Sequence, residues 1–240
     1  MARVDKRAAP KRRRARARGL ALKRAFDAVF AVAALAALSP LFGLVALAIK
    51  LTSAGPVFFR QERTGLGGRP FFIYKFRTMV KDAPALGPAI TGAGDPRVTA
   101  VGRVLRATKL DELPNLVNVV RGEMSIVGPR PDLPLFMMGL SPEQREILTF
   151  RPGLTGPTQI RYIAEEEMLS PVNIDENYAE NVLRDKIASD RAYVQSWSFG
   201  RDLVLILYTA VALAFKTLGK ATRVLAHRRP AAAHPLPPPR

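Results

Sequence analysis

The chain has 240 residues, with 37 Lys and Arg against 20 Asp and Glu, and therefore a formal net charge of +17. It contains no cysteine, and its two histidines, His227 and His234, both lie close to the C-terminus. These counts exclude disulfides, thiol nucleophiles and thiolate metal sites, and they exclude a Ser-His-Asp triad or a His-rich zinc site in the core.

The positive charge is concentrated at the two ends of the chain. Residues 1–24 hold 11 Lys and Arg and one acidic residue, and residues 220–240 hold five Lys and Arg and no acidic residue. We expect a basic disordered arm over 1–22 and a basic, Pro-rich tail over 219–240. Such ends suit anionic lipid headgroups or RNA. Because the middle of the chain is close to neutral, a basic nucleic-acid-binding face is not expected there.

An uncharged apolar run of 22 residues covers positions 28–49. As a straight helix it would measure about 33 Å, which is enough to span a bilayer. Ser39 and Pro40 lie in its middle, where Pro lacks an N–H and a Ser hydroxyl can satisfy the freed carbonyl. Cations, which favour the cytoplasm, flank the run on both sides: Lys23, Arg24, Lys50, Arg60 and Arg63. We therefore predict a re-entrant membrane helix over 23–51 that breaks at Ser39 and Pro40. The residues alone leave a Pro-kinked spanning helix open.

Glycine and proline punctuate residues 52–80, and residues 71–79 are typical of an extended segment. In that conformation Lys75 and Arg77 point to the same face and could grip a diphosphate, although an exposed polar strand face would look the same. Residues 82–95 are typical of a loop.

Two adjacent carboxylates, Asp111 and Glu112, stand at the expected start of a helix in the centre of the chain. Pro114 suits a first turn, and apolar residues follow the helical spacing: Leu113, Leu116, Val117 and Val120. A carboxylate at a helix N-terminus faces free N–H groups and the positive end of the dipole, which keeps it ionised. The pair could be a nucleophile or a ligand for Mg²⁺, and the alternative is an ordinary helix cap. Arg103 and Arg106 lie just upstream.

A short apolar segment at residues 124–127 leads into the Gly-Pro-Arg-Pro turn at 128–131. The prolines on both sides fix the backbone and would aim Arg130, unless that side chain is simply solvated.

The C-terminal third is predicted to be mainly helical. Residues 141–144 mark a helix start, and residues 175–196 predict one helix. The acidic triplet at 165–167 is typical of a solvated helix face rather than a metal site. The uncharged run at 203–215 is too short to span a membrane and suits an interfacial or buried helix.

Several short motifs, in their order along the chain, resemble those of the bacterial sugar transferases, the monotopic polyprenyl-phosphate phosphoglycosyl transferases. The matching segments are residues 23–27, 39–40, 55–59, 74–79, 95–99, 110–114, 121–131 and 151–156. Each motif is weak alone, whereas the ordered set is highly specific and covers about residues 23–218. One departure is Gly-Pro-Thr-Gln at 156–159, where the family often has Gly-Trp-Ala-Gln, and it leaves the sugar or nucleotide preference open.

The resemblance implies an enzyme that transfers a sugar-1-phosphate from a nucleotide-diphosphate sugar, usually a UDP-sugar, to polyprenyl (undecaprenyl) phosphate. UMP is released, and the reaction is the first membrane step of surface glycan synthesis (exopolysaccharide, capsule or O-antigen). Asp111 would be the nucleophile that forms an aspartyl-phosphosugar intermediate, with Glu112 as its metal or acid–base partner and Mg²⁺ bound by both. Phosphate contacts would come from four cations: Lys75, Arg77, Arg106 and Arg130.

The expected fold is α/β mixed and helix-rich. It would be a monotopic membrane protein with an N-terminal re-entrant helix-break-helix and amphipathic helices on the membrane surface. A catalytic domain over 52–218 would lie on the cytoplasmic face of the bacterial inner membrane, in contact with lipids and not with nucleic acid. A homo-oligomer stays open. The alternatives are another Mg²⁺-dependent membrane phosphotransferase, a diphosphate hydrolase, a nucleic-acid-binding membrane protein and a non-catalytic scaffold for glycan assembly.

Overall fold

The structure is a computed structural model that describes residues 8–87, 91, 94–162 and 182–227. Within these ranges it is rich in helix and contains two small sheets, which confirms the expected α/β mixed class. The acidic triplet at 165–167 and the first part of the helix expected over 175–196 lie outside the described residues.

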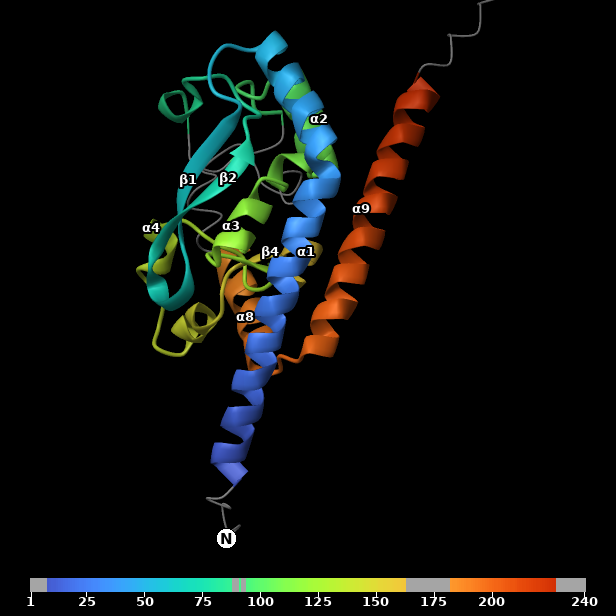
Figure 1. The fold of residues 1–240 in the computed structure, drawn as a ribbon. Coiled ribbons are helices and arrows are strands. Elements are labelled where there is room, and N and C mark those ends of the chain that lie inside the picture. Colours follow the sequence, from blue (N-terminus) through green and yellow to red (C-terminus); the bar gives the residue numbers. More distant parts are fainter. Residues whose placement is uncertain (1–7, 88–90, 92–93, 163–181, 228–240) are drawn as a thin grey trace, which may run out of the picture.

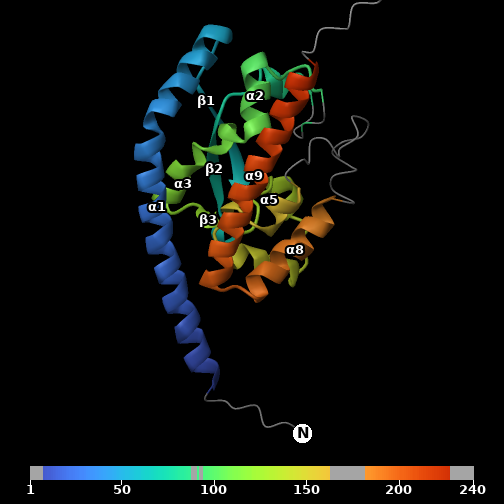
Figure 2. The same cartoon turned by 90° about the vertical axis from the view of Figure 1, so that its right-hand side faces the viewer.

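Two long helices, α1 (Ala8–Thr52) and α9 (Phe199–His227), lie on the outside of the molecule. In Figure 2, α9 crosses the face turned toward the viewer and α1 runs along the left edge (Figures 1 and 2). The shorter helices and strands follow in chain order: β1 Phe58–Thr64, β2 Pro70–Phe76, α2 Ala100–Thr108, α3 Asn115–Arg121, β3 Ser125–Val127, α4 Pro134–Met137, β4 Gly153–Thr155, α5 Pro157–Arg161 and α8 Leu183–Gln195. Short 3₁₀ helices complete the body: η1 Leu66–Gly68, η2 Ala83–Ala85, η3 Leu110–Glu112 and η4 Gln144–Thr149.

Helix α1 passes through Ser39 and Pro40 without a break, so the helix-break-helix expected there is wrong. Pro40 has no N–H to donate to the carbonyl of Ala36, one turn earlier. The Ser39 hydroxyl donates to that same oxygen at 2.8 Å. Because this bond replaces the missing one, Pro40 does not end the helix. The helix also begins at Ala8, so the part of the expected disordered arm that the structure describes is helical.

Both halves of α1 pack against the same body. In the first half, Lys23 Nζ lies 2.7 Å from Asp202 Oδ2 of α9, and Asp27 accepts a hydrogen bond from Ser125 Oγ at 2.6 Å. The second half contributes to a buried apolar cluster: Val45, Ile49, Phe76 and Leu105. Helix α1 is therefore held to the body on both sides of Pro40.

The remaining surface of α1 is apolar and exposed, chiefly through Val29, Phe30, Val32, Leu44, Leu47 and Leu51. By length and composition, Arg16–Thr52 is apolar enough to cross a membrane. The run at 203–215 belongs to the longer helix α9, which also exposes apolar side chains: Leu203, Val204, Leu207, Tyr208, Val211 and Phe215. Exposed apolar surface of this extent is typical of membrane association.

Strands β1 and β2 form an antiparallel hairpin in which Phe58 lies opposite Phe76, and β2 overlaps the extended segment predicted at residues 71–79. Strands β3 and β4 form a second, parallel pair. The two backbones approach closely: a Cβ on Gly153 would lie 2.1 Å from the backbone N of Gly128, so only glycine fits at this position.

Buried Asn118 joins α3 to the hairpin. Its Oδ1 accepts a hydrogen bond from the backbone N of Tyr74 at 3.2 Å, and its Nδ2 donates to the backbone O of Phe72 at 2.7 Å. The amide thus pairs with β2 as a neighbouring strand would. This contact fixes Lys75, the next residue of β2, relative to the turn that precedes α3.

Candidate active site

The carboxylate pair lies on a tight turn between two helices. Helix α2 ends at Thr108, and Lys109 then adopts the left-handed conformation with φ of 58°. The 3₁₀ helix η3 carries Asp111 and Glu112, and Pro114 leads into α3. The pair therefore stands at a helix start, as predicted. Left-handed backbone is uncommon outside Gly, Asn and Asp, so the turn holds Lys109 under strain.

Glu112 is already engaged with a cation. Its Oε1 lies 2.8 Å from Lys75 Nζ, and both side chains are mostly buried, with 19% and 20% of their surface exposed. Burial by itself would raise the pKa of Glu112, but the neighbouring cations, Lys75 first among them, outweigh burial and hold that pKa well below its ordinary value. Glu112 is therefore anionic and oriented by Lys75.

Asp111 has a different environment from its neighbour. Only 8% of its surface is exposed, and its buried Oδ1 has no hydrogen-bond partner. Burial raises the pKa of Asp111 to about 6, against the opposing charge of Lys75 and with support from the negative charge of Glu112. The expectation of an ionised carboxylate thus holds above about pH 6. A buried, unpartnered anionic oxygen is suited to attack phosphorus or to bind a cation.

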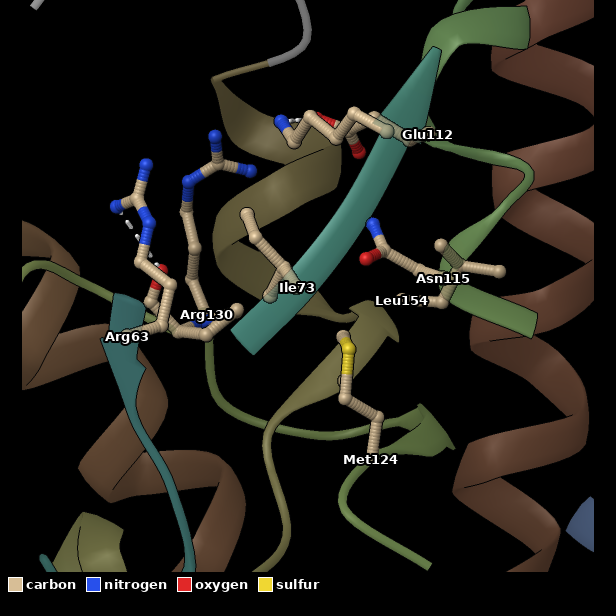
Figure 3. Close-up of a pocket in the computed structure, with 10 residues that line it drawn as sticks. Arg63, Ile73, Glu112, Asn115, Met124, Arg130 and Leu154 are labelled. Carbon is tan, nitrogen blue, oxygen red and sulfur yellow. Dashed lines mark hydrogen bonds and ion pairs between the residues drawn. The ribbon is translucent and has the colours of Figure 1, made fainter. Parts of the chain in front are cut away.

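A pocket opens beside Glu112 (Figure 3). Arg63 of β1, Lys75 of β2 and Arg130 of the turn after β3 line it, together with Asn115 of α3. The rest of the lining is mainly apolar: Ile73, Met124, Pro131, Gly153 and Leu154. Three cations around one carboxylate favour a ligand with more than one negative charge, such as a diphosphate.

Lys75 and Arg77 do not meet at this pocket. Strand β2 ends at Phe76, and the Arg77 side chain turns toward the end of α1, where its Nη2 donates to both the backbone O and the Oγ of Ser53 at 2.8 Å. The prediction that both cations share one face failed because the strand alternation does not extend to Arg77.

Arg106 lies on the same side of the site as Arg77. Its Nη1 is 3.4 Å from Thr78 Oγ1, and its positive charge is one of those that favour the ionised form of Asp111. The four predicted cations therefore form two groups, with Lys75 and Arg130 at the pocket and Arg77 and Arg106 near α1.

Asp190 of α8 is a site residue that sequence reasoning missed. It is buried, and it accepts hydrogen bonds from the backbone N of Arg130 at 2.8 Å and from Thr158 Oγ1 at 2.5 Å. Burial raises the pKa of Asp190 to about 7, against these two hydrogen bonds. It fixes the backbone from which Arg130 reaches the pocket, and no local motif signals this contact.

Arg63 and Asn115 were also missed as pocket residues. Arg63 was considered only as a cation flanking the apolar run. Side chains two residues apart on a strand share a face, so the positions of Gln61 and Arg63 on β1 could have indicated that both point to the same side. Its Nη2 donates to Gln61 Oε1 at 2.7 Å and its Nη1 to the backbone O of Pro131 at 3.3 Å. These bonds aim Arg63 along the pocket wall.

In the part of the chain that the structure describes, no three His, Cys, Asp or Glu side chains gather into a metal site. Mg²⁺, however, often takes only one or two carboxylates and completes its shell with water and phosphate oxygens of the substrate. The Asp111–Glu112 pair, with the unpartnered Oδ1 of Asp111, fits a site of that kind.

The largely buried carboxylate pair, the cationic pocket and the exposed apolar surfaces of two helices are features that suit a membrane-associated enzyme acting on a phosphorylated ligand. The chain belongs to the bacterial sugar transferase family, whose model matches residues 18–216. This match confirms the resemblance that the motifs indicated.

Three relatives show how the match is distributed. The chain is 44% identical over 196 residues to the UDP-glucose:undecaprenyl-phosphate glucose-1-phosphate transferase of Caulobacter vibrioides, which covers 80% of this chain and 69% of that protein. It is 43% identical over 198 residues to the undecaprenyl-phosphate glucose phosphotransferase of Komagataeibacter xylinus, covering 78% and 35%. It is 40% identical over 199 residues to the exopolysaccharide production protein PSS of Rhizobium leguminosarum bv. phaseoli, covering 80% and 94%. The chain therefore spans almost all of the Rhizobium protein and about a third of the Komagataeibacter protein.

Proposed function

We propose that this enzyme transfers a sugar-1-phosphate from a UDP-sugar to undecaprenyl phosphate and releases UMP, as the first membrane step in the synthesis of an exopolysaccharide or another surface glycan. The names of the Caulobacter and Komagataeibacter relatives describe transferases that act on undecaprenyl phosphate. The observation that carries the proposal is the buried Asp111–Glu112 pair, set among cations in a chain of this family.

The pocket beside Glu112 would hold the diphosphate of the UDP-sugar. Arg63, Lys75 and Arg130 line it and offer positive charge to the phosphate oxygens. Phosphoryl transfer depends mainly on such positioning and charge neutralisation. Glu112 keeps Lys75 in place through their 2.8 Å ion pair.

In the first step, an oxygen of Asp111 attacks the phosphorus that bears the sugar. The bond from that phosphorus to the UMP oxygen breaks, UMP leaves with the electron pair, and the sugar phosphate stays on Asp111 as an acyl phosphate. Mg²⁺, held by Asp111 and Glu112, would neutralise charge on the diphosphate and on the leaving UMP. In the second step, a phosphate oxygen of the lipid attacks the same phosphorus and restores the Asp111 carboxylate.

We further propose that α1 enters the inner membrane from the cytoplasmic side and does not cross it, so that the catalytic body lies on the cytoplasmic face. Both halves of α1 are tied to that body, through the Lys23–Asp202 ion pair and through the apolar cluster around Ile49. Its exposed apolar side chains would then face lipid. UDP-sugars are cytoplasmic, so the body has to be on that side.

A panel of UDP-sugars, assayed with purified protein and undecaprenyl phosphate, tests the function. We expect UMP and a lipid-linked diphosphosugar from at least one donor, with loss of activity in excess chelator and recovery on addition of Mg²⁺. Hydrolysis of the donor without any lipid product would indicate a diphosphate hydrolase instead. Absence of UMP with every donor would favour the scaffold alternative.

A further inference from the structure

The cations around Asp111 fall into two groups with different surroundings. One group lines the pocket beside Glu112, as described above. The other lies at the C-terminal end of α1 and consists of Lys50, Arg77 and Arg106, here called the helix-end cluster. None of these three residues lines the pocket beside Glu112, so their charge needs a separate explanation.

Two members of the helix-end cluster, Lys50 and Arg77, are held by oxygens of Gly55 and Ser53 rather than by carboxylates. Lys50 Nζ donates to the backbone O of Gly55 at 3.0 Å, and Arg77 Nη2 donates to Ser53. Within the described ranges, neither Lys50 nor Arg77 forms an ion pair. Arg77 is only 6% exposed, yet its Nε and Nη1 are buried without a hydrogen-bond partner. Positive charge and donor capacity at this place are therefore left unused by the protein.

Gly55 makes this arrangement of Arg77 feasible. Its φ is +115°, and a Cβ built on it would lie 2.2 Å from Arg77 Nη1. A side chain at this position would displace the guanidinium, so the loop after α1 keeps room for the buried cation.

The helix-end cluster connects to the nucleophile through Arg106. Thr78 directly follows Arg77, and Arg106 Nη1 lies 3.4 Å from its hydroxyl. Arg106 also acts electrostatically on Asp111. Helix α2, which carries Arg106, packs against α1 through Leu105 in the cluster that contains Ile49. The positive charge thus extends from the end of α1 to Asp111.

On its other side, the helix-end cluster borders the apolar surface of α1. Leu47 and Leu51 flank Lys50 in the sequence and are 56% and 77% exposed. An apolar surface that leads directly to a group of cations suits a ligand with a long apolar chain and a phosphate at its end. The chain would lie on the α1 surface and the phosphate would contact the cations. Such a phosphate would lie next to Asp111.

We infer that the helix-end cluster binds the phosphate of the lipid acceptor, on the side of Asp111 away from the donor pocket. This inference rests on the proposed function and assigns its second substrate to a place. In the transfer, a lipid phosphate oxygen forms the new bond to phosphorus, the bond from phosphorus to Asp111 breaks, and the electron pair returns to the carboxylate. With the lipid phosphate as a dianion the charges balance and no proton moves.

The two half-reactions separate the two groups of cations. Lys50→Gln should leave the stoichiometric burst of UMP, measured without lipid, close to wild type, because Lys50 does not line the donor pocket. Discharge of the isolated adduct by undecaprenyl phosphate should slow roughly tenfold or more at low lipid, and excess lipid should restore it. Arg103→Gln is the matched control, since Arg103, like Lys50, is an exposed cation that donates to a backbone oxygen, that of Val98. It should change neither step. Arg130→Gln should slow the UMP burst.

Direct binding decides the inference independently of the chemistry. Undecaprenyl phosphate in detergent micelles, titrated without donor, should bind Arg106→Gln and Lys50→Gln roughly tenfold more weakly than Arg103→Gln or wild type. Excess phosphatidylglycerol should not displace it. Equal lipid affinity in all four proteins would overturn the inference. Weaker lipid binding by Arg130→Gln alone would also overturn it, because the acceptor would then use the vacated donor pocket. If wild type binds lipid as expected but gives no UMP burst, the covalent step of the proposed function fails and the lipid site stands.

Discussion

Asp111 and Glu112 are adjacent in the chain and yet differ in their polar partners and in the direction in which their pKa values are shifted. Glu112 is paired with Lys75 and has a lowered pKa, whereas Asp111 is buried, has a raised pKa and keeps one oxygen without a partner. Two carboxylates whose environments separate their pKa values usually have separate roles. The unpartnered oxygen supports our proposal that Asp111 is the nucleophile, and the ion pair supports a role for Glu112 in orienting Lys75.

Asp111→Asn should lower UMP formation by roughly a thousandfold or more, because the amide keeps the shape but is not an anionic nucleophile. Folding should not suffer. The raised pKa means that the folded protein binds the Asp111 proton more tightly than the unfolded chain, so ionisation of Asp111 lowers stability as pH rises from about 4 to about 6. At pH 7 the variant should therefore melt at the wild-type temperature or a few degrees higher. Substantial UMP release by a folded Asp111→Asn protein would contradict the assignment.

The rate of the UMP burst should depend on pH with a midpoint near 6. Asp111 reacts as the carboxylate, so the rate should fall about tenfold per pH unit below its pKa of about 6 and level off above it. Glu112 titrates at lower pH and does not contribute in this range. Asp190, with a pKa of about 7, titrates nearby and holds the backbone of Arg130. The inflection near 6 should persist in Asp190→Asn, and a flat profile between pH 5 and 7 would argue against Asp111 as the titrating group.

At the scale of elements, the sequence patterns predicted those structures that depend on residues close together in the chain. The helix start at the carboxylate pair, the extended segment at β2 and the apolar helix over 203–215 are all present. The break at Pro40 was wrong, because the neighbouring Ser39 satisfies the freed carbonyl and the helix continues. Arg77 was misplaced because its direction depends on where β2 ends, which alternation alone does not show.

A double-mutant cycle can measure the compensation between Ser39 and Pro40. Ser39→Ala should lower the free energy of unfolding by about 1 kcal/mol, because the carbonyl of Ala36 then has no donor. In the Pro40→Ala background the new backbone N–H serves that carbonyl, so Ser39→Ala should cost close to nothing. Thermal unfolding of the four proteins in one detergent gives the coupling, and equal costs in both backgrounds would show that the hydroxyl does not replace the missing bond.

At the scale of the whole molecule, the important contacts join residues far apart in the sequence, and for that reason no motif revealed them. Asp190 supports Arg130, and Asn118 ties α3 to β2. Lys23 and Asp202 are buried together and join the two long helices. Removing one partner of such a buried pair typically costs about 3–5 kcal/mol, because the other charge is left uncompensated. The two apolar helices are therefore fixed to the catalytic body and not merely attached to it by loops.

That rigid attachment leads to a prediction about topology. If α1 spanned the membrane, its two ends would lie on opposite sides, and the contacts of Lys23 with Asp202 and of Ile49 with Leu105 could not both be made by one cytoplasmic body. Cysteines introduced as Arg18→Cys and Ala54→Cys, both at exposed positions, can be probed with an impermeant thiol reagent in intact cells. The natural chain has no cysteine, so background labelling of the protein is absent. Both sites should be protected until the membrane is opened. Labelling of the Arg18→Cys protein alone from outside would mean that α1 crosses the bilayer and that the contacts of its first half with the body do not form in the cell.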